Sequence, residues 1–219
     1  MVADSPLVRR AVRTGGLLLA VAAAQLVAVL LWVQERSSGF SPWSTTVTSL
    51  ARGRSLDAVA LAGSLLVLGV VAGVALLLAW SAFDPRPSRS LGLLVLVVAA
   101  GASAAAGGLL LLPGSLAGSL VAPMIAAAVV AAGIGLLVVS RAMHQHGRWR
   151  VSAAYTLATG LVLLGAGALD YAHLRFGLGS GGLERIVLGA ALLWALVEGT
   201  HLALLHRFAP GLLVKVAAA

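Results

Sequence analysis

Residues 58–80 read AVALAGSLLVLGVVAGVALLLAW, a stretch of apolar and small residues without a single charged side chain. A helix needs about 20 such residues to cross the ~30 Å hydrocarbon core of a bilayer. Backbone N–H and C=O groups find no water in lipid, so a lone segment satisfies them only by forming a helix. The stretch therefore predicts a transmembrane helix.

Apolar stretches of similar length lie on both sides of it. The six predicted spans are residues 15–33, 58–80, 91–112, 116–140, 151–169 and 186–205. They lack the strict alternation of a barrel strand. We therefore expect an all-α, polytopic bundle of six transmembrane helices, formed as a single transmembrane domain over residues 1–219. The first span is 19 residues long and interrupted only by Gln25, which favours a retained anchor over a cleaved signal peptide.

The composition supports a membrane protein and excludes several other classes. Hydrophobic residues make up 60% of the chain and charged residues 10%, whereas soluble domains average about 25% charged. The net charge of +8 comes from short arginine clusters between apolar runs, so we expect no nucleic-acid partner. The absence of cysteine excludes disulfides, thiolate nucleophiles and Cys-ligated metal centres.

The distribution of basic residues predicts the orientation. Ten fall on the side that holds both termini: Arg9, Arg10, Arg13, Arg86, Arg89, Arg141, Arg148, Arg150, Arg207 and Lys215. Five fall on the other side: Arg36, Arg52, Arg54, Arg175 and Arg185. The positive-inside rule then places both termini in the cytoplasm. Heavy use of Ala, Leu, Val, Gly and Arg is typical of a GC-rich bacterial gene, and so of a bacterial plasma membrane.

Glu198 is the most informative polar residue because it lies inside the sixth span. Ionisable groups in a membrane are costly and mark functional sites. His201 follows three positions later, on the same helix face. Together they are candidates for proton relay, metal binding or headgroup binding. The alternative is structural, with Glu198 neutralised or paired to a neighbouring helix. Pro123 in the fourth span is a candidate for a helix break of the kind seen in transporters.

A second polar cluster is expected on the outer face. Its members are Asp170, Tyr171, His173, Glu184, Arg185, Arg52 and Arg54. If residues 34–57 meet residues 170–185, these side chains form a polar lid over the bundle. Glu184 at the start of the last helix would also favour the helix dipole, a purely structural role. Structural ion pairs and a catalytic cluster both remain open here.

On the cytoplasmic side, Arg141, Arg148 and Arg150 are expected to contact lipid headgroups. We expect no cofactor and no metal. Haem or a metal held by His201 with His144 or His146 is an alternative, disfavoured by the neighbouring arginines. Trp149 is expected in an interfacial aromatic belt. Recurring small residues predict close helix packing within the bundle, and are compatible with a homo-oligomer or with other membrane subunits.

Two segments carry a resemblance to a known family. Residues 44–51 read STTVTSLA before the second span, and residues 183–187 read LERIV before LLW at 192–194. With the six spans, these segments are similar to the six-span membrane family called domain of unknown function 998, a relative of the Frag1/DRAM/Sfk1-like membrane proteins. The resemblance implies a fold and a membrane location, without an established reaction.

The sequence leaves several functions open. We expect a non-enzymatic accessory subunit, or a membrane module that binds a lipid or an apolar ligand, because no catalytic motif is present. One alternative is a small proton-coupled transporter that uses Glu198 and His201. Another is a lipid-modifying enzyme with its site in the outer-face polar cluster.

Overall fold

The computed structural model describes residues 6–80, 87–144, 149–174 and 176–208. The helices are α1 (Pro6–Arg36), α2 (Val47–Leu50), α3 (Leu56–Trp80), α4 (Pro87–Leu111), α5 (Ser115–His144), α6 (Arg150–Tyr171) and α7 (Gly179–Phe208). Six of them are long and apolar enough to cross a membrane. This confirms the predicted all-α, six-span bundle, and the chain is a multi-pass membrane protein.

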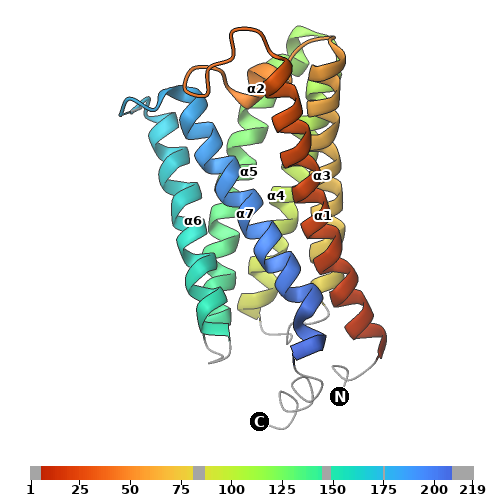
Figure 1. The fold of residues 1–219 in the computed structure, drawn as a ribbon. Coiled ribbons are helices and arrows are strands. Elements are labelled where there is room, and N and C mark those ends of the chain that lie inside the picture. The colour runs from red at the N-terminus through yellow and green to blue at the C-terminus, as the bar shows by residue number, and fades with distance from the viewer. Residues whose placement is uncertain (1–5, 81–86, 145–148, 175, 209–219) are drawn as a thin grey trace.

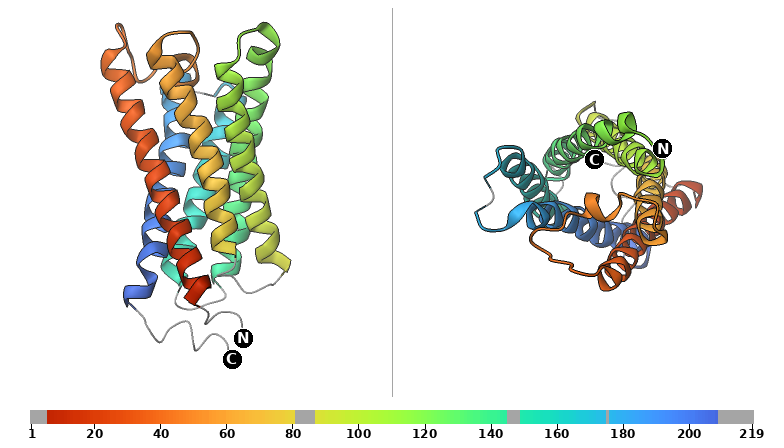
Figure 2. Two further views of the ribbon diagram at one scale, coloured as in Figure 1. Left: turned by 90° about the vertical axis from the view of Figure 1, so that its right-hand side faces the viewer. Right: turned by 90° about the horizontal axis from the view of Figure 1, so that it is seen from above.

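The six long helices form a closed ring in chain order. Each packs against its neighbours in the sequence, and α7 returns to pack against α1. The view along the bundle shows this ring, with α2 lying over one end of it (Figure 2). Helix α1 begins and helix α7 ends at the same end of the bundle, which we call the terminal end; the opposite end is the α2 end (Figure 1). An even number of crossings requires this arrangement.

The ring closes where glycines on α1 and α7 face each other. A Cβ on Gly16 would lie 2.5 Å from the carbonyl oxygen of Gly199, and one on Gly199 would lie 2.7 Å from that of Gly16. Such distances are shorter than van der Waals contact, so only glycine permits this approach of the two backbones. The contact also fixes the position of the residue before Gly199, which is Glu198.

The helices extend beyond the predicted spans at most ends. α1 has 31 residues against 19 predicted, since hydropathy locates only the part of a helix that lies in hydrocarbon. α5 runs without interruption through Pro123. The expected helix break at this proline was therefore wrong, because proline is tolerated in membrane helices where neighbouring groups satisfy the freed backbone.

Candidate functional site

Glu198 lies on the buried face of α7, within the terminal half of the bundle. Leu192 and Ala195 share this face, whereas Leu193 and Val197 point outward and are about half exposed. The 3–4 residue spacing of a helix thus carries the carboxylate into the interior, where the residue is only 4% exposed. One carboxylate oxygen, Oε1, is buried and has no hydrogen-bond partner.

His201 connects this carboxylate with the terminal end. Its Nδ1 lies 3.4 Å from Oε2 of Glu198 and 3.1 Å from the hydroxyl of Ser152 on α6. The His201 side chain is 40% exposed, against 5% for that of Glu198. The Trp149 ring packs against the imidazole, with 5.2 Å between ring centroids. A titratable group thus links the buried carboxylate to the more accessible end of the site.

Two polar side chains of α6 complete the surroundings of Glu198. Thr156 is fully buried and accepts a hydrogen bond of 3.1 Å from the indole Nε1 of Trp194. The Tyr155 hydroxyl is buried and has no hydrogen-bond partner. Among the lysine and arginine side chains that the structure describes, none forms an ion pair with Glu198.

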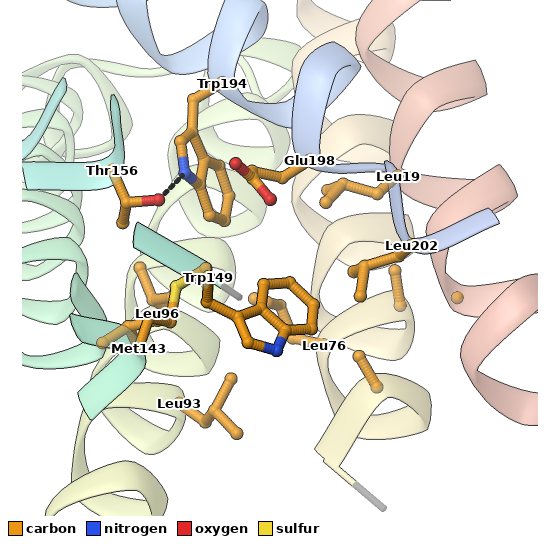
Figure 3. Close-up of a pocket in the computed structure, with 14 residues that line it drawn as sticks. Leu19, Leu76, Leu93, Leu96, Met143, Trp149, Thr156, Trp194, Glu198 and Leu202 are labelled. Carbon is orange, nitrogen blue, oxygen red and sulfur yellow. Dashed lines mark hydrogen bonds between the residues drawn. The ribbon is translucent and has the colours of Figure 1, made fainter. Parts of the chain in front are cut away.

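A small cavity adjoins Glu198 inside the ring. Its volume is about 40 Å³, and Trp149, Trp194, Thr156 and Glu198 line it together with apolar residues (Figure 3). The cavity has room for water-sized groups beside Glu198. Pockets for drug-sized ligands are about 300–1,000 Å³. The cavity is therefore smaller than a pocket for a drug-sized ligand, and nearly all of its wall is carbon.

The α2 end is held together by Glu184. Its carboxylate accepts hydrogen bonds from the backbone N–H groups of Val47 and Thr48, at 2.5 and 3.0 Å, and from the Thr48 hydroxyl. The side chain thus caps α2 from a position more than 130 residues away in the chain. The expected dipole role at the last helix was wrong: α7 begins at Gly179, so Glu184 lies beyond its first turn.

Arg185 fixes the same loop through backbone carbonyl groups. Its Nη1 donates hydrogen bonds of 2.6 Å to Pro42 and 2.7 Å to Thr45, and its guanidinium lies 5.0 Å from the centroid of the Phe40 ring. The N–H of Gly181 adds a bond of 3.1 Å to the Trp43 carbonyl. We call Glu184, Arg185 and the loop residues 40–48 that they bind the α2 clamp.

The remaining outer-face candidates lie apart from the clamp. In the described part of the chain, neither Asp170, Tyr171 nor His173 bonds to Glu184 or Arg185 through its side chain. Arg52 donates a weak bond of 3.5 Å to the Gly118 carbonyl, and Arg54 is exposed. The predicted lid thus forms only in part, because residues 40–48 meet the start of α7 while the end of α6 does not join them.

The residues that were expected on the cytoplasmic side lie at the terminal end, as far as the structure describes them. Arg141, Arg150 and His144 are exposed, whereas Arg148 and His146 lie outside the described residues. Among the residues that the structure describes, no group of three or more His, Asp or Glu side chains is placed to hold a metal ion.

Sequence reasoning missed the partners of Glu198. Trp149 was expected at the end of a span and lies there, directly before α6, and its ring also lines the cavity and contacts His201. Trp194 is four residues before Glu198, a helical spacing that places both on one face. Ser152, Thr156 and Thr159 also recur at helical spacing along α6. This line of hydroxyl side chains was the signal that would have identified α6 as the neighbour of the site.

No protein-family model, no curated protein and no solved structure matches this chain.

Proposed function

We propose that this multi-pass membrane protein is a small proton-coupled transport protein in which Glu198 is the proton-binding group. The supporting observation is a carboxylate 4% exposed, with one unpartnered oxygen, beside a cavity of about 40 Å³. An ionisable side chain inside a bilayer is expensive and marks ion or proton pathways. His201 provides the connection from Glu198 to the terminal end.

A second polar step lies between Glu198 and the α2 end. The Gln25 amide on α1 donates a hydrogen bond of 3.0 Å to the Ser64 hydroxyl on α3, and its Oε1 is buried without a partner. Gln25 is nine residues beyond Gly16 along α1, about 14 Å further toward the α2 end. We propose that a proton released from Glu198 passes this amide when the bundle opens toward the α2 end.

Proton flux into proteoliposomes tests the proposal. Purified protein would be reconstituted with a pH-sensitive dye inside the vesicles, and an inward proton gradient applied. We expect flux above that of protein-free vesicles, and its loss in Glu198→Gln, which retains shape but cannot ionise. Glu35→Gln is the matched control, since Glu35 is exposed at the end of α1. Flux that persists unchanged in Glu198→Gln would refute the proposal.

We further propose that the terminal end faces the cytoplasm of a bacterium and that the protein resides in its plasma membrane. The ten-to-five distribution of basic residues supports this orientation. Exposed Arg141 and Arg150 at the terminal end would then contact anionic headgroups.

A non-enzymatic accessory subunit or lipid-binding module is the second candidate. The supporting observation is two glycines that have no atom within 4 Å of the position a Cβ would occupy, Gly165 on α6 and Gly189 on α7. Both face outward, and small residues allow another helix or an acyl chain to approach closely. Co-purification of a defined subunit or lipid that is lost in Gly165→Leu would support this function; equal recovery would count against it.

An enzyme with its site on the outer face is the least supported function. Both carboxylate oxygens of Glu184 accept bonds from the α2 segment, so neither is free for acid–base chemistry. The resemblance to domain of unknown function 998 is retained as a proposal. Its supporting observation is that the two segments on which it rests, residues 44–51 and 183–187, contact each other through hydrogen bonds of Glu184 and Arg185.

A further inference from the structure

We infer that the ring opens sideways between α6 and α7 at the terminal end, and that this opening connects the Glu198 cavity with the lipid. The inference goes beyond the proposed function, because it names the part of the bundle that moves whether or not protons pass. The packing of neighbouring helices, the bonds between α6 and α7, and the lining of the cavity lead to it.

At the other five contacts of the ring, a glycine lets two adjacent helices approach closely. A Cβ on any of these glycines would lie 3.1 Å or less from an atom of the neighbouring helix, which is closer than side chains normally come. They are Gly15 on α1 against α3, Gly69 on α3 against α4, Gly92 on α4 against α5, Gly160 on α6 against α5, and Gly199 on α7 against α1. Close van der Waals packing of this kind is what holds helices together in lipid.

The contact between α6 and α7 lacks such a glycine. Among the glycines that the structure describes on these two helices, none has its nearest neighbours on the other helix. Gly165 on α6 and Gly189 on α7 have no atom within 4 Å of the position a Cβ would occupy. The two helices lie side by side at the α2 end and diverge toward the terminal end (Figure 1).

Side chains bridge α6 and α7 where the helices diverge. The indole of Trp194 donates a hydrogen bond of 3.1 Å to the Thr156 hydroxyl. Nearer the terminal end, Nδ1 of His201 lies 3.1 Å from the Ser152 hydroxyl. Side-chain hydrogen bonds thus take the place of the close helix packing at the other contacts, and such bonds between membrane helices are weak on average. The ring should therefore open here first.

Opening at this contact would give the cavity an exit to the lipid. Helix α6 is held to α5 at Gly160 and α7 to α1 at Gly199, so each moves with its other neighbour. Trp194 lines the cavity and forms one of the bonds that must break, so the same step opens the side of the cavity. Nearly all of the cavity wall is carbon. Contact with acyl chains costs such a wall little, because lipid tails are as apolar as leucine.

Distances between spin labels test the opening, because the chain has no cysteine and single pairs can be introduced. Full-length protein in lipid vesicles would carry nitroxide labels at Ala154→Cys on α6 and Val197→Cys on α7, two exposed positions in the terminal half of the bundle. Leu17→Cys with Val197→Cys, which spans the contact of α1 with α7, is the matched control. Pulsed electron spin resonance should give a second, longer distance for the α6–α7 pair and a single distance for the α1–α7 pair.

Two valine substitutions on α6 test whether the Trp194 bond holds the opening closed. Thr156→Val removes the acceptor of this bond. It should raise the fraction at the longer distance about threefold, the factor for losing one average hydrogen bond between membrane helices. Thr159→Val is the control, because the Thr159 hydroxyl bonds to the Tyr155 carbonyl of the same helix, and it should leave the fraction unchanged.

A single α6–α7 distance that Thr156→Val leaves unchanged would overturn the opening. An equal second distance for the α1–α7 pair would also overturn it, since the whole bundle would then be loose. If Thr156→Val does not fold, the comparison of the two pairs in the protein without that substitution decides. Two distances across α6 and α7 without proton flux would refute the proposed function and leave the opening intact. Flux with a single distance would do the reverse.

Discussion

Glu198 and Gln25 illustrate how single polar residues are held in an apolar interior. Gln25 finds a partner across α1 and α3 for its amide nitrogen, while Glu198 meets only the weakly paired His201 at 3.4 Å. A buried ionisable group without a compensating partner lowers stability, and such residues persist where function needs them. At the scale of residues, Glu198 is therefore the position where stability and function should conflict.

This conflict predicts that Glu198→Gln stabilises the fold while abolishing flux. Replacing this ionisable group, whose Oε1 is buried without a hydrogen-bond partner, by a neutral amide should raise the free energy of unfolding by about 1–3 kcal/mol, or the melting midpoint by roughly 2–4 °C per kcal/mol. Thermal melting in detergent at neutral pH measures the shift. Glu35→Gln should stay within about 0.5 kcal/mol of the unmodified protein. A marked decrease in the Glu198→Gln midpoint would mean that the carboxylate makes a stabilising contact that the substitution removes.

At the scale of elements, the short helix α2 depends on a side chain from the far end of the chain. A four-residue helix is not stable by itself. The Glu184 carboxylate accepts the free N–H groups at its start, as an N-terminal cap does, and Arg185 holds the preceding loop. The α2 segment is thus held in place by side chains of α7, although α3 is the helix that follows it in the sequence.

Glu184→Gln should therefore loosen the α2 segment. The amide would turn an N–H₂ group toward backbone donors, with a cost of about 1–3 kcal/mol for a hydrogen bond to a charged acceptor. Arg52 and Arg54 follow α2 and are exposed, so trypsin cleavage after them reports the change. We expect faster cleavage in Glu184→Gln, and no change in Asp170→Asn, which lies apart from the clamp. Equal rates in both variants would contradict the role of the clamp.

The contact between α1 and α7 supplies a second test on the scale of elements. Gly199→Ala should lower the melting midpoint, because its Cβ would lie 2.7 Å from the Gly16 carbonyl oxygen and the two helices must separate. Gly189→Ala is the control on the same helix, since nothing lies within 4 Å of its Cβ position; it should be neutral or slightly stabilising, by up to about 1 kcal/mol. Similar midpoints for the two variants would mean that the ring tolerates opening at this contact.

At the scale of the whole molecule, the fold was predictable to the extent that lipid dictates it. The length and polarity of each span identified six crossings. The side of each helix that faces the bundle interior was harder to predict from the sequence. Lipid and the bundle interior are equally apolar, so the helices have no polar face that marks the outside. Helical spacing alone placed Glu198 and His201 on one face. The sequence did not predict that the Trp149 ring lines the cavity or that Glu184 binds the α2 segment.

The orientation of the molecule can be tested by labelling, because the chain has no cysteine. Single variants Arg10→Cys at the terminal end and Ser38→Cys at the α2 end would be treated in intact cells with a membrane-impermeant maleimide. Both positions are exposed. We expect Ser38→Cys to react and Arg10→Cys to react only after the membrane is permeabilised. Labelling of Arg10→Cys in intact cells would show that the orientation is the opposite of the one proposed.

The contact of α7 with α1 has a consequence for how the protein is made. About 170 residues separate the end of α1 from that of α7, and at about 5–20 residues per second a ribosome needs roughly 10–30 s to synthesise them. During that interval α1 resides in the bilayer without its final neighbour, and Glu198 has not yet been translated. The carboxylate and the cavity beside it therefore form only after α7 has been synthesised, long after α1 has entered the bilayer.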